Sequence, residues 1–162
     1  MIIEDITELP AALPRARAIM GLDLGTKTIG VAVSDRLLSV ASALETVKRV
    51  KFTLDAARLA EIVAKREIGA IILGLPRNMD GSEGPRAQST RAFARNLTRL
   101  DAFAGLPIAY WDERLSTVAA ERALLEADMA RKRRAEVIDA VAASYILQGA
   151  LDRLYHLRTE HP

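Results

Sequence analysis

Three acidic positions of this chain stand in surroundings that do not suit an isolated carboxylate. The first is Asp23, which interrupts the apolar run 18–24 between Leu22 and Leu24. Burying an ionised acid without a cation or a set of donors costs several kcal/mol. Lys27, in the Gly-Thr-Lys-Thr turn that follows, is the only basic residue near it in the sequence. The stretch therefore suits a carboxylate that meets a charged ligand.

The second acidic position follows an apolar strand predicted over residues 106–111. Asp112 and Glu113 both lie just past the carboxyl end of that strand, where sites gather in open α/β sheets. Alternation turns the two side chains to opposite faces, so only one of them points at a given site. Spacing alone leaves both candidates open.

The third acid, Asp139, is the only charge on a helical stripe of small apolar residues. Its neighbours on that face are Ala135, Ala142, Ala143 and Ile146. Such a stripe packs closely, so a carboxylate within it needs a partner.

A divalent cation can serve all three acids at once. Carboxylates that converge within ~4 Å repel by ~4 kcal/mol per pair at an effective dielectric of about 20. Mg²⁺ removes this repulsion and favours one or two carboxylates together with substrate phosphate. The pattern predicts metal-assisted phosphodiester hydrolysis.

Each acid also has a structural interpretation, and these stay open at this point. Asp23 can cap its turn through Thr26 or Thr28. Glu113 can pair with Arg114, and Asp139 can pair with Arg77 or Arg134.

Composition restricts the class of protein. The chain has 162 residues, half of them hydrophobic, a net charge of +2 and no cysteine. One domain is expected from this length, and the lack of cysteine excludes disulfides and a thiolate site and favours the cytoplasm. No membrane-spanning segment is expected, because no apolar run reaches the ~18 residues of a membrane span. The charge is concentrated in the basic run 131–134.

The periodicity predicts an α/β domain over residues 18–156, between a flexible leader over 1–17 and a tail over 157–162. Strands are expected over a hairpin at 18–35 and over 37–47, 70–75 and 106–111. Helices are expected from 54 to near 69 and over 86–103, 116–126 and 131–156. This order predicts a mixed five-stranded sheet, an antiparallel meander followed by crossovers, with helices on both faces.

Four motifs in order resemble the YqgF family of RuvC-like, RNase H-fold proteins. They are GLDLGTKTIGVAVSD at 21–35, GLPRNMDGSEG at 74–84, WDERLST at 111–117 and DAVAASYILQ at 139–148. The resemblance covers about residues 17–154 and implies an RNase H-like sheet. It also implies a nuclease, a hydrolase acting on ester bonds, that matures the 5′ end of the small-subunit rRNA precursor in ribosome biogenesis.

The resemblance further implies a catalytic and metal-binding triad of Asp23, Glu113 and Asp139, which selects Glu113 over Asp112. The expected cofactor is Mg²⁺ or Mn²⁺, and the expected partner is a structured nucleic acid, precursor rRNA or a DNA junction, with ribosomal particles as a further partner. RNase H-like nucleases often use a fourth acid, for which Asp35 and Glu136 are candidates.

Several basic and polar residues are candidates for substrate binding beside the triad. The turn supplies Thr26 and Lys27, the Gly-rich loop supplies Arg77 and Asn78, and Arg114 follows Glu113. The basic run adds Arg131, Arg133 and Arg134, and cations at a helix N-terminus oppose its dipole, which favours a phosphate partner there.

Three other functions fit parts of the pattern. A Holliday junction resolvase in DNA recombination would need a two-fold dimer, whereas the sequence predicts a monomer or weak homodimer. Actin-like ATPases share an Asp-x-Gly-Thr turn but bind nucleotide between two such domains. A non-catalytic nucleic-acid-binding protein would gain nothing from three mutually repelling acids.

Overall fold

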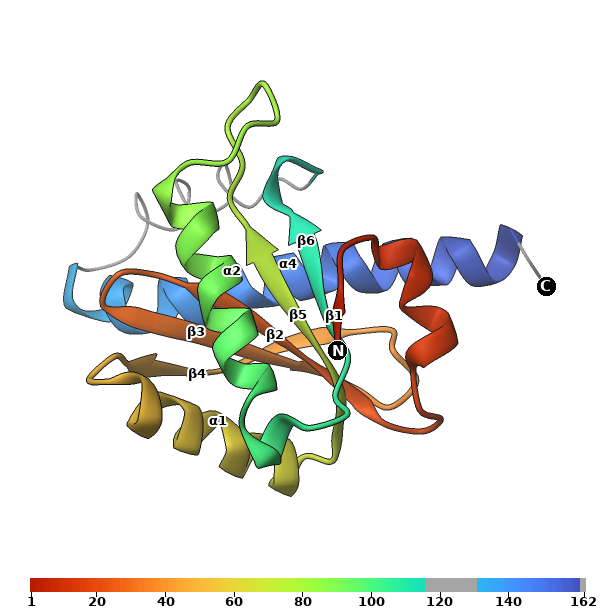
Figure 1. The fold of residues 1–162 in the computed structure, drawn as a ribbon, viewed down its shortest axis with the longest axis horizontal. Helices are drawn as coiled ribbons and strands as arrows, with labels where there is room; N and C mark the ends of the chain where they lie inside the picture. Colours follow the sequence, from red (N-terminus) through yellow and green to blue (C-terminus); the bar gives the residue numbers. More distant parts are fainter. Residues whose placement is uncertain (116–130, 161–162) are drawn as a thin grey trace.

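The computed structural model describes residues 1–115 and 131–160, with side chains from 138 to 159 in the second range. One sheet has the strand order β1-β6-β5-β2-β3-β4 (Figure 1). Its strands are β1 Ile2–Ile3, β2 Ala18–Leu24, β3 Thr28–Ser34, β4 Ala41–Lys48, β5 Ile68–Leu75 and β6 Ile108–Asp112. The helices are α1 Phe52–Lys65, α2 Pro85–Thr98 and α4 Arg131–Glu160, with 3-10 turns η1 Ile6–Glu8, η2 Pro10–Ala12, η3 Asp101–Phe103 and η4 Glu113–Leu115.

The sheet is mixed, as the sequence predicts. β2 and β3 form the antiparallel hairpin, and β4 adds to β3 in antiparallel register. β5 pairs in parallel with both β2 and β6. Every residue of β2 and β5 is buried, because helices cover both faces of these central strands.

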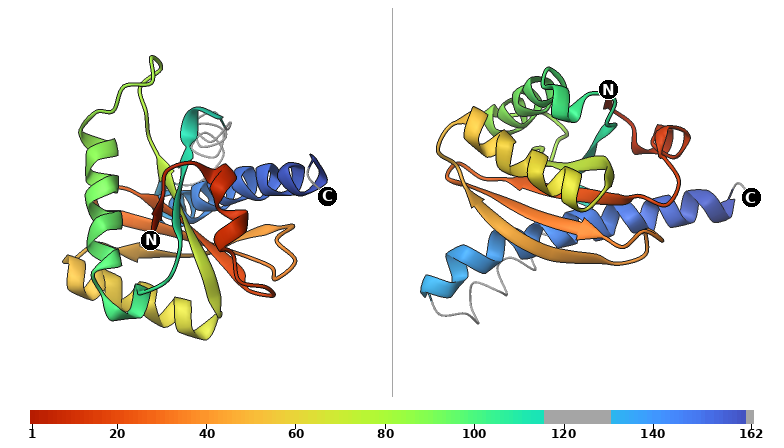
Figure 2. Two further views of the ribbon diagram at one scale, coloured as in Figure 1. Left: turned by 45° about the vertical axis from the view of Figure 1, so that its right-hand side comes forward. Right: turned by 90° about the horizontal axis from the view of Figure 1, so that it is seen from below.

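Helices cover the two faces of the sheet unequally. α1 and α2 pack on one face, where Leu59 and Phe93 join the core, and α4 runs across the other, where Leu147 is fully buried (Figure 2). The predicted arrangement of helices on both faces is confirmed. No helix in the described ranges combines the length and apolar character needed to cross a membrane.

The first residues depart from the prediction of a flexible leader and a five-stranded sheet. Residues Ile2 and Ile3 pair in parallel with β6 and make a sixth strand at the sheet edge. Leu9 is completely buried in the core beneath α4. The segment has no period because β1 is only two residues long and the rest consists of single turns around one buried leucine.

Three helix boundaries also differ from the predictions. The helix expected from 54 to near 69 is α1, which ends at Lys65, because β5 already begins at Ile68. The helix expected over 86–103 ends at Thr98, and a separate 3-10 turn brings the fully buried Phe103 into the core. The last helix continues past residue 156 to Glu160. The helix expected from Ser116 or Thr117 to about 126 lies outside the described residues.

Candidate active site

The candidate site lies at the end of the sheet where the carboxyl termini of three parallel strands meet. β2, β5 and β6 run in the same direction, so their carboxyl ends meet at this edge. Asp23 is the penultimate residue of β2, Glu113 follows β6 directly, and the loop 76–84 follows β5 and extends beyond the sheet (Figure 1). Residues distant in sequence are thus gathered where α/β sheets place their sites.

Asp23 is a buried carboxylate on the α4 side of the sheet. Its relative exposure is 4%, and its partner across the hairpin is Gly30. Gly21 shares its face two residues earlier, and a Cβ on Gly21 would lie 2.7 Å from the Leu147 Cβ of α4. Asp23 therefore points towards α4, on the layer that carries Asp139.

Asp139 reaches this layer because α4 touches β3 at a glycine. A Cβ on Gly30 would lie 1.8 Å from the carbonyl oxygen of Asp139, so only glycine admits the helix here. The Asp139 carboxylate accepts a hydrogen bond from the Thr28 hydroxyl. Of the partners considered from sequence, Arg77 instead forms its ion pair with Glu83, and the Arg134 side chain is outside the described part.

Glu113 approaches from the other side of Asp23. A Cβ on Gly74 would lie 2.7 Å from Glu113 Oε1 and 2.6 Å from Ile146 Cδ1 of α4. Gly74 follows Leu73, which pairs with Leu22, so Gly74 stands beside Asp23 in the parallel register. Because Gly74 has no side chain, the Glu113 carboxylate can lie directly over it.

Two glycines thus flank Asp23, and each borders one of the other two acids. Within the described residues no three acidic, histidine or cysteine side chains lie close enough to enclose an ion by themselves. Mg²⁺ keeps several waters and takes only one or two protein carboxylates with substrate phosphates, so it needs no such cage. The carboxylates near Asp23 are hard oxygen donors of the type that Mg²⁺ and Mn²⁺ bind.

Asp112, the alternative to Glu113, is engaged elsewhere. Its carboxylate accepts hydrogen bonds from Arg114, including one from Nη2 at 2.7 Å, and these lower the pKa of Asp112. Arg114 Nη1 also donates to the carbonyl of Met79 at 3.4 Å. Arg114, expected as a phosphate clamp, therefore fastens the end of β6 to the loop 76–84.

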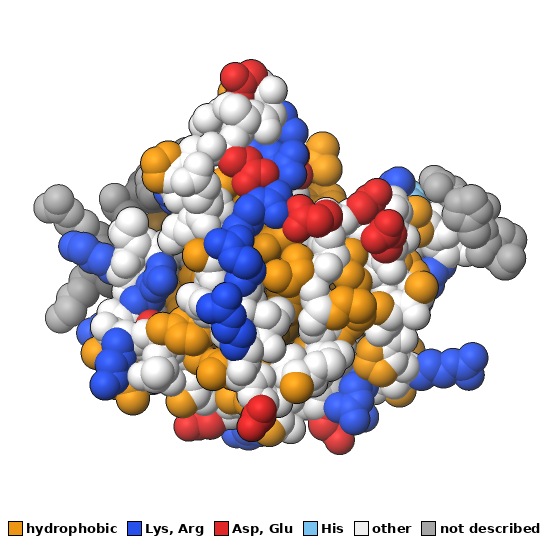
Figure 3. Space-filling model, in the orientation of Figure 1, with side chains coloured by type: hydrophobic (Ala, Val, Ile, Leu, Met, Phe, Trp, Pro, Cys, Tyr) orange, Lys and Arg blue, Asp and Glu red, His pale blue; other side chains and the backbone are white. Residues whose placement is uncertain are grey.

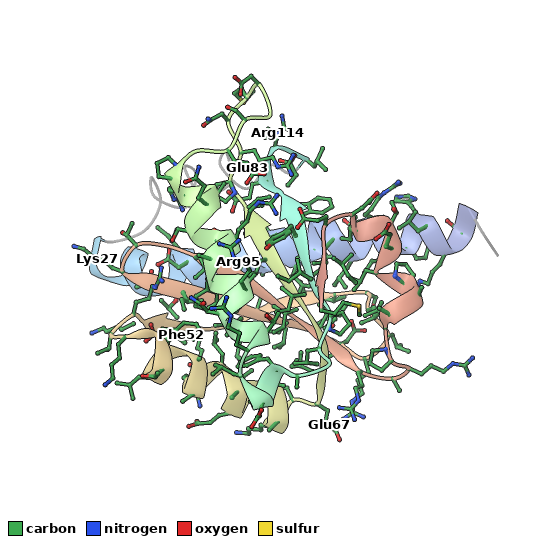
Figure 4. The ribbon with its side chains drawn as sticks, viewed as in Figure 1. Lys27, Phe52, Glu67, Glu83, Arg95 and Arg114 are labelled. Atoms are coloured by element: carbon green, nitrogen blue, oxygen red, sulfur yellow. The ribbon has the colours of Figure 1, made fainter. Side chains whose placement is uncertain are left out.

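The loop 76–84 uses its own polar groups to hold its shape. The Asn78 side-chain amide donates to Ser82 Oγ at 2.9 Å, and Asp80 accepts from the backbone of Ser82. Arg77 lies 3.6 Å from Glu83, whose pKa is lowered by hydrogen bonds from Arg91. Arg114 lies beside this loop, and Glu83 lies nearer to the start of α2 (Figure 4). Arg77 Nε is buried and has no hydrogen-bond partner in the described residues, which keeps Arg77 a candidate for binding substrate.

The other predicted substrate-binding residues lie apart from this loop. Thr26 and Lys27 are exposed at the tip of the β2–β3 hairpin (Figure 4). Arg131, Arg133 and Arg134 lie at the start of α4, and their side chains are outside the described part, as is that of Glu136. Asp35 follows antiparallel β3 and so lies at the opposite edge of the sheet from Asp23, which places it away from the three acids.

Two arginines near the end of β2 were not predicted from the sequence as candidates for the site. Arg49 Nη1 donates to the carbonyl of Gly25 at 2.7 Å, and Arg86 Nη2 donates to that of Leu24 at 3.3 Å. They come from different elements, after β4 and in the first turn of α2, so no spacing in the sequence connects them.

Comparison with known proteins gives close relatives. The model of a family described as "RuvX: Holliday junction resolvase" matches residues 17–153. A protein of Roseobacter denitrificans named "Putative pre-16S rRNA nuclease" is 72% identical over 160 residues, which cover 99% of this chain and 98% of the relative. A protein of Jannaschia sp. with the same name is 72% identical over 158 residues, 98% of this chain and 99% of the relative.

Solved structures with a similar fold are more distant in sequence. RuvC of Thermus thermophilus in complex with a Holliday junction substrate aligns with a TM-score of 0.51 at 17% identity, over 85% of this chain and 96% of that chain. A second Thermus thermophilus RuvC structure gives 0.50 at 18% identity, with the same coverage. At such identity the likeness concerns the fold alone, and it confirms the predicted RNase H-like class.

Proposed function

This chain belongs to the RuvX family. On that premise we propose that it is a metal-dependent nuclease whose catalytic and metal-binding residues are Asp23, Glu113 and Asp139. The resemblance to YqgF proteins is confirmed by this membership, and the enzyme class is that of a nuclease, a hydrolase acting on phosphodiester bonds. The observation that carries the choice of residues is that Gly30 and Gly74 flank Asp23 and border Asp139 and Glu113 respectively.

The chain's own residues prepare the reaction by fixing carboxylate positions. Asp23 is held in a fully buried central strand, which keeps its carboxylate preorganised. Thr28 orients Asp139 through its hydroxyl, and Glu113 reaches over Gly74 from the end of β6. Bound Mg²⁺ or Mn²⁺ would supply an activated water and positive charge for the leaving oxygen.

The names of the relatives favour the precursor of small-subunit ribosomal RNA as the substrate of this chain. Relatives 72% identical over nearly the whole chain carry the name of a pre-16S rRNA nuclease. The proposed role is maturation of the 5′ end of that precursor in the cytoplasm, on ribosomal particles, by a monomer or weak homodimer. The arginines that fasten and border the loop 76–84 suit contact with a phosphate backbone.

The family description favours a second candidate, a Holliday junction resolvase. Symmetric cutting of two strands requires a two-fold dimer that presents two copies of the site. Sedimentation of the protein alone and with a four-way DNA junction distinguishes the two roles, because a resolvase sediments as a dimer on the junction.

The experiment that tests the proposed function is cleavage of a substrate panel in Mg²⁺ or Mn²⁺. The panel holds a precursor rRNA 5′ end, an unrelated single-stranded RNA and a four-way DNA junction, each labelled at one end. Cutting of the precursor at a defined position, with slower cutting of the unrelated RNA, is the expected result. Cutting of the junction alone would replace this function with that of a resolvase, and no cutting of any substrate would overturn the nuclease.

A further inference from the structure

A pocket of about 230 Å³ opens at the carboxyl end of β2 on the face opposite the acids. Leu24, which lines it, faces the α1 and α2 layer, whereas its neighbour Asp23 faces α4. The other lining groups come from the turn after β2, from the residue after β4 and from the start of α2. They include Gly25, Thr26, Arg49, Arg86 and Ser89.

The two arginines of this pocket are fixed by the backbone of the β2 end. Arg49 donates to the Gly25 carbonyl and also stacks over Phe93, with its Cζ 5.8 Å from the ring centroid. Arg86 donates to the Leu24 carbonyl. A guanidinium has five N–H donors, so one bond to a carbonyl orients the group and leaves donors for an anion.

Neither arginine has a carboxylate partner among the described residues. Elsewhere in the same part of the chain arginines pair with acids, as Arg91 does with Glu83 at 2.6 Å and Arg114 does with Asp112 at 2.7 Å. The ion pairs of residues 1–115 and 138–159 include none to Arg49 or Arg86. Two positive charges that line one pocket repel each other unless an anion lies between them.

Hydroxyl groups complete a phosphate-like binding environment. Thr26 and Ser89 are exposed at the pocket and can donate to anionic oxygens. α2 begins here at Pro85, and its N-cap residue Gly84 supplies no side-chain cap, so the positive end of the helix dipole faces the same region. Figure 3 shows Lys and Arg side chains gathered over the α2 side of the molecule.

We propose that this pocket binds a phosphodiester group of the nucleic-acid strand, at a position adjacent to the group that is cut. Asp23 and Leu24 are consecutive and point to opposite faces, so a strand that crosses the end of β2 meets the acids on one side and the two arginines on the other. The inference rests on the proposed function for its ligand, and it assigns the residues that hold the strand in register.

The test measures the binding of a labelled single-stranded RNA and of a labelled four-way DNA junction. Fluorescence anisotropy reports the binding, in EDTA and over a range of salt concentrations. Arg86→Gln removes an exposed side chain and is expected to weaken binding and to reduce the salt slope for the single strand by about 0.7, the value for one phosphate contact. Arg99→Gln, at the far end of the same helix, is the control and keeps the wild-type slope.

A second pair of variants tests the pocket without removing an arginine. Ser89→Glu places a negative charge at the pocket and is expected to weaken binding at least tenfold, whereas Gln88→Glu places the same charge beside it on α2, outside the pocket lining. Wild-type binding by either Arg86→Gln or Ser89→Glu overturns the proposal. An equal loss of binding in the two controls, or the absence of binding to both probes, also overturns it.

Cleavage assays on the same variants separate this proposal from the proposed function. If wild type binds RNA, Arg86→Gln binds it more weakly and wild type cuts no substrate, the proposed nuclease function is contradicted and the phosphate pocket is supported. If Arg86→Gln cuts and binds as wild type does, the pocket is contradicted and the nuclease is supported.

Discussion

The hydroxyl of Thr28 donates a hydrogen bond to the carboxylate of Asp139, across 111 positions of the sequence. Thr28 begins β3, next to the turn that follows Asp23, and Asp139 lies on α4. The bond therefore connects the hairpin that carries one acid to the helix that carries another. Their relative position depends on this contact and on the packing of α4 over Gly30.

Replacement of Thr28 tests whether this bond positions Asp139. Thr28→Val removes the donor and keeps the shape, and we expect cleavage to fall about 10- to 100-fold, as for other groups that orient metal ligands, with a higher Mn²⁺ requirement. Thr28→Ser keeps a hydroxyl and should restore most of the activity. Equal activity of the Val and Ser variants would show that the hydroxyl has no positioning role.

Replacement of Gly30 tests the contact between α4 and β3. In Gly30→Ala the new Cβ would meet the Asp139 carbonyl at 1.8 Å, so α4 must move, and the free energy of unfolding should fall by at least ~1–3 kcal/mol, with loss of cleavage. Gly84→Ala is the control, because its Cβ meets only Asn78 Nδ2, at 3.9 Å. A Gly30→Ala protein with the thermal stability of wild type would contradict the packing described for this helix.

The sequence predicted the acids of the site better than the groups that surround them. Asp23 and Asp139 could be found because each interrupts an apolar pattern, and the family resemblance chose Glu113 over Asp112. The pairing of Arg114 with Asp112 could not be predicted, because it depends on how the chain turns after β6. Arg49 and Arg86 meet only through the fold, and no local pattern connects them.

The pH dependence of stability should include a contribution from Asp35. Hydrogen bonds from the Val40 backbone and the Ser39 hydroxyl lower the pKa of Asp35 from 3.8 to about 2. A lowered folded-state pKa means that the contribution is fully present above pH 4 and is lost as the pH falls towards 2. Asp35→Ala should therefore lower the melting temperature at pH 7 and match wild type near pH 2.

Thermal melts of wild type and Asp35→Ala across this pH range check the expectation. Asp101→Ala serves as control, because Asp101 is exposed and its carboxylate makes no hydrogen bond in the described residues. A melting-temperature difference that stays constant from pH 7 to pH 2 would rule out the ionised Asp35 as its source.

The first residues should contribute to stability, contrary to the expectation of a flexible leader. Leu9 is completely buried, so Leu9→Ala should cost about 2–5 kcal/mol of unfolding free energy in a denaturant titration. Leu37→Ala, at a side chain that is 80% exposed, should cost almost nothing. Equal stability of the two variants would return residues 1–17 to the status of a leader that does not pack on the domain.

The central claim is that a metal-dependent reaction takes place at the acids around Asp23. The most direct measurement is the cleavage rate of the labelled precursor rRNA end against Mn²⁺ concentration, for wild type, Asp23→Asn and the control Asp152→Asn, an exposed acid of α4. We predict no cleavage in EDTA, a loss of at least about 100-fold in Asp23→Asn and wild-type rates in Asp152→Asn. Cleavage that survives in EDTA, or an Asp23→Asn protein that cuts as fast as wild type, would contradict the account.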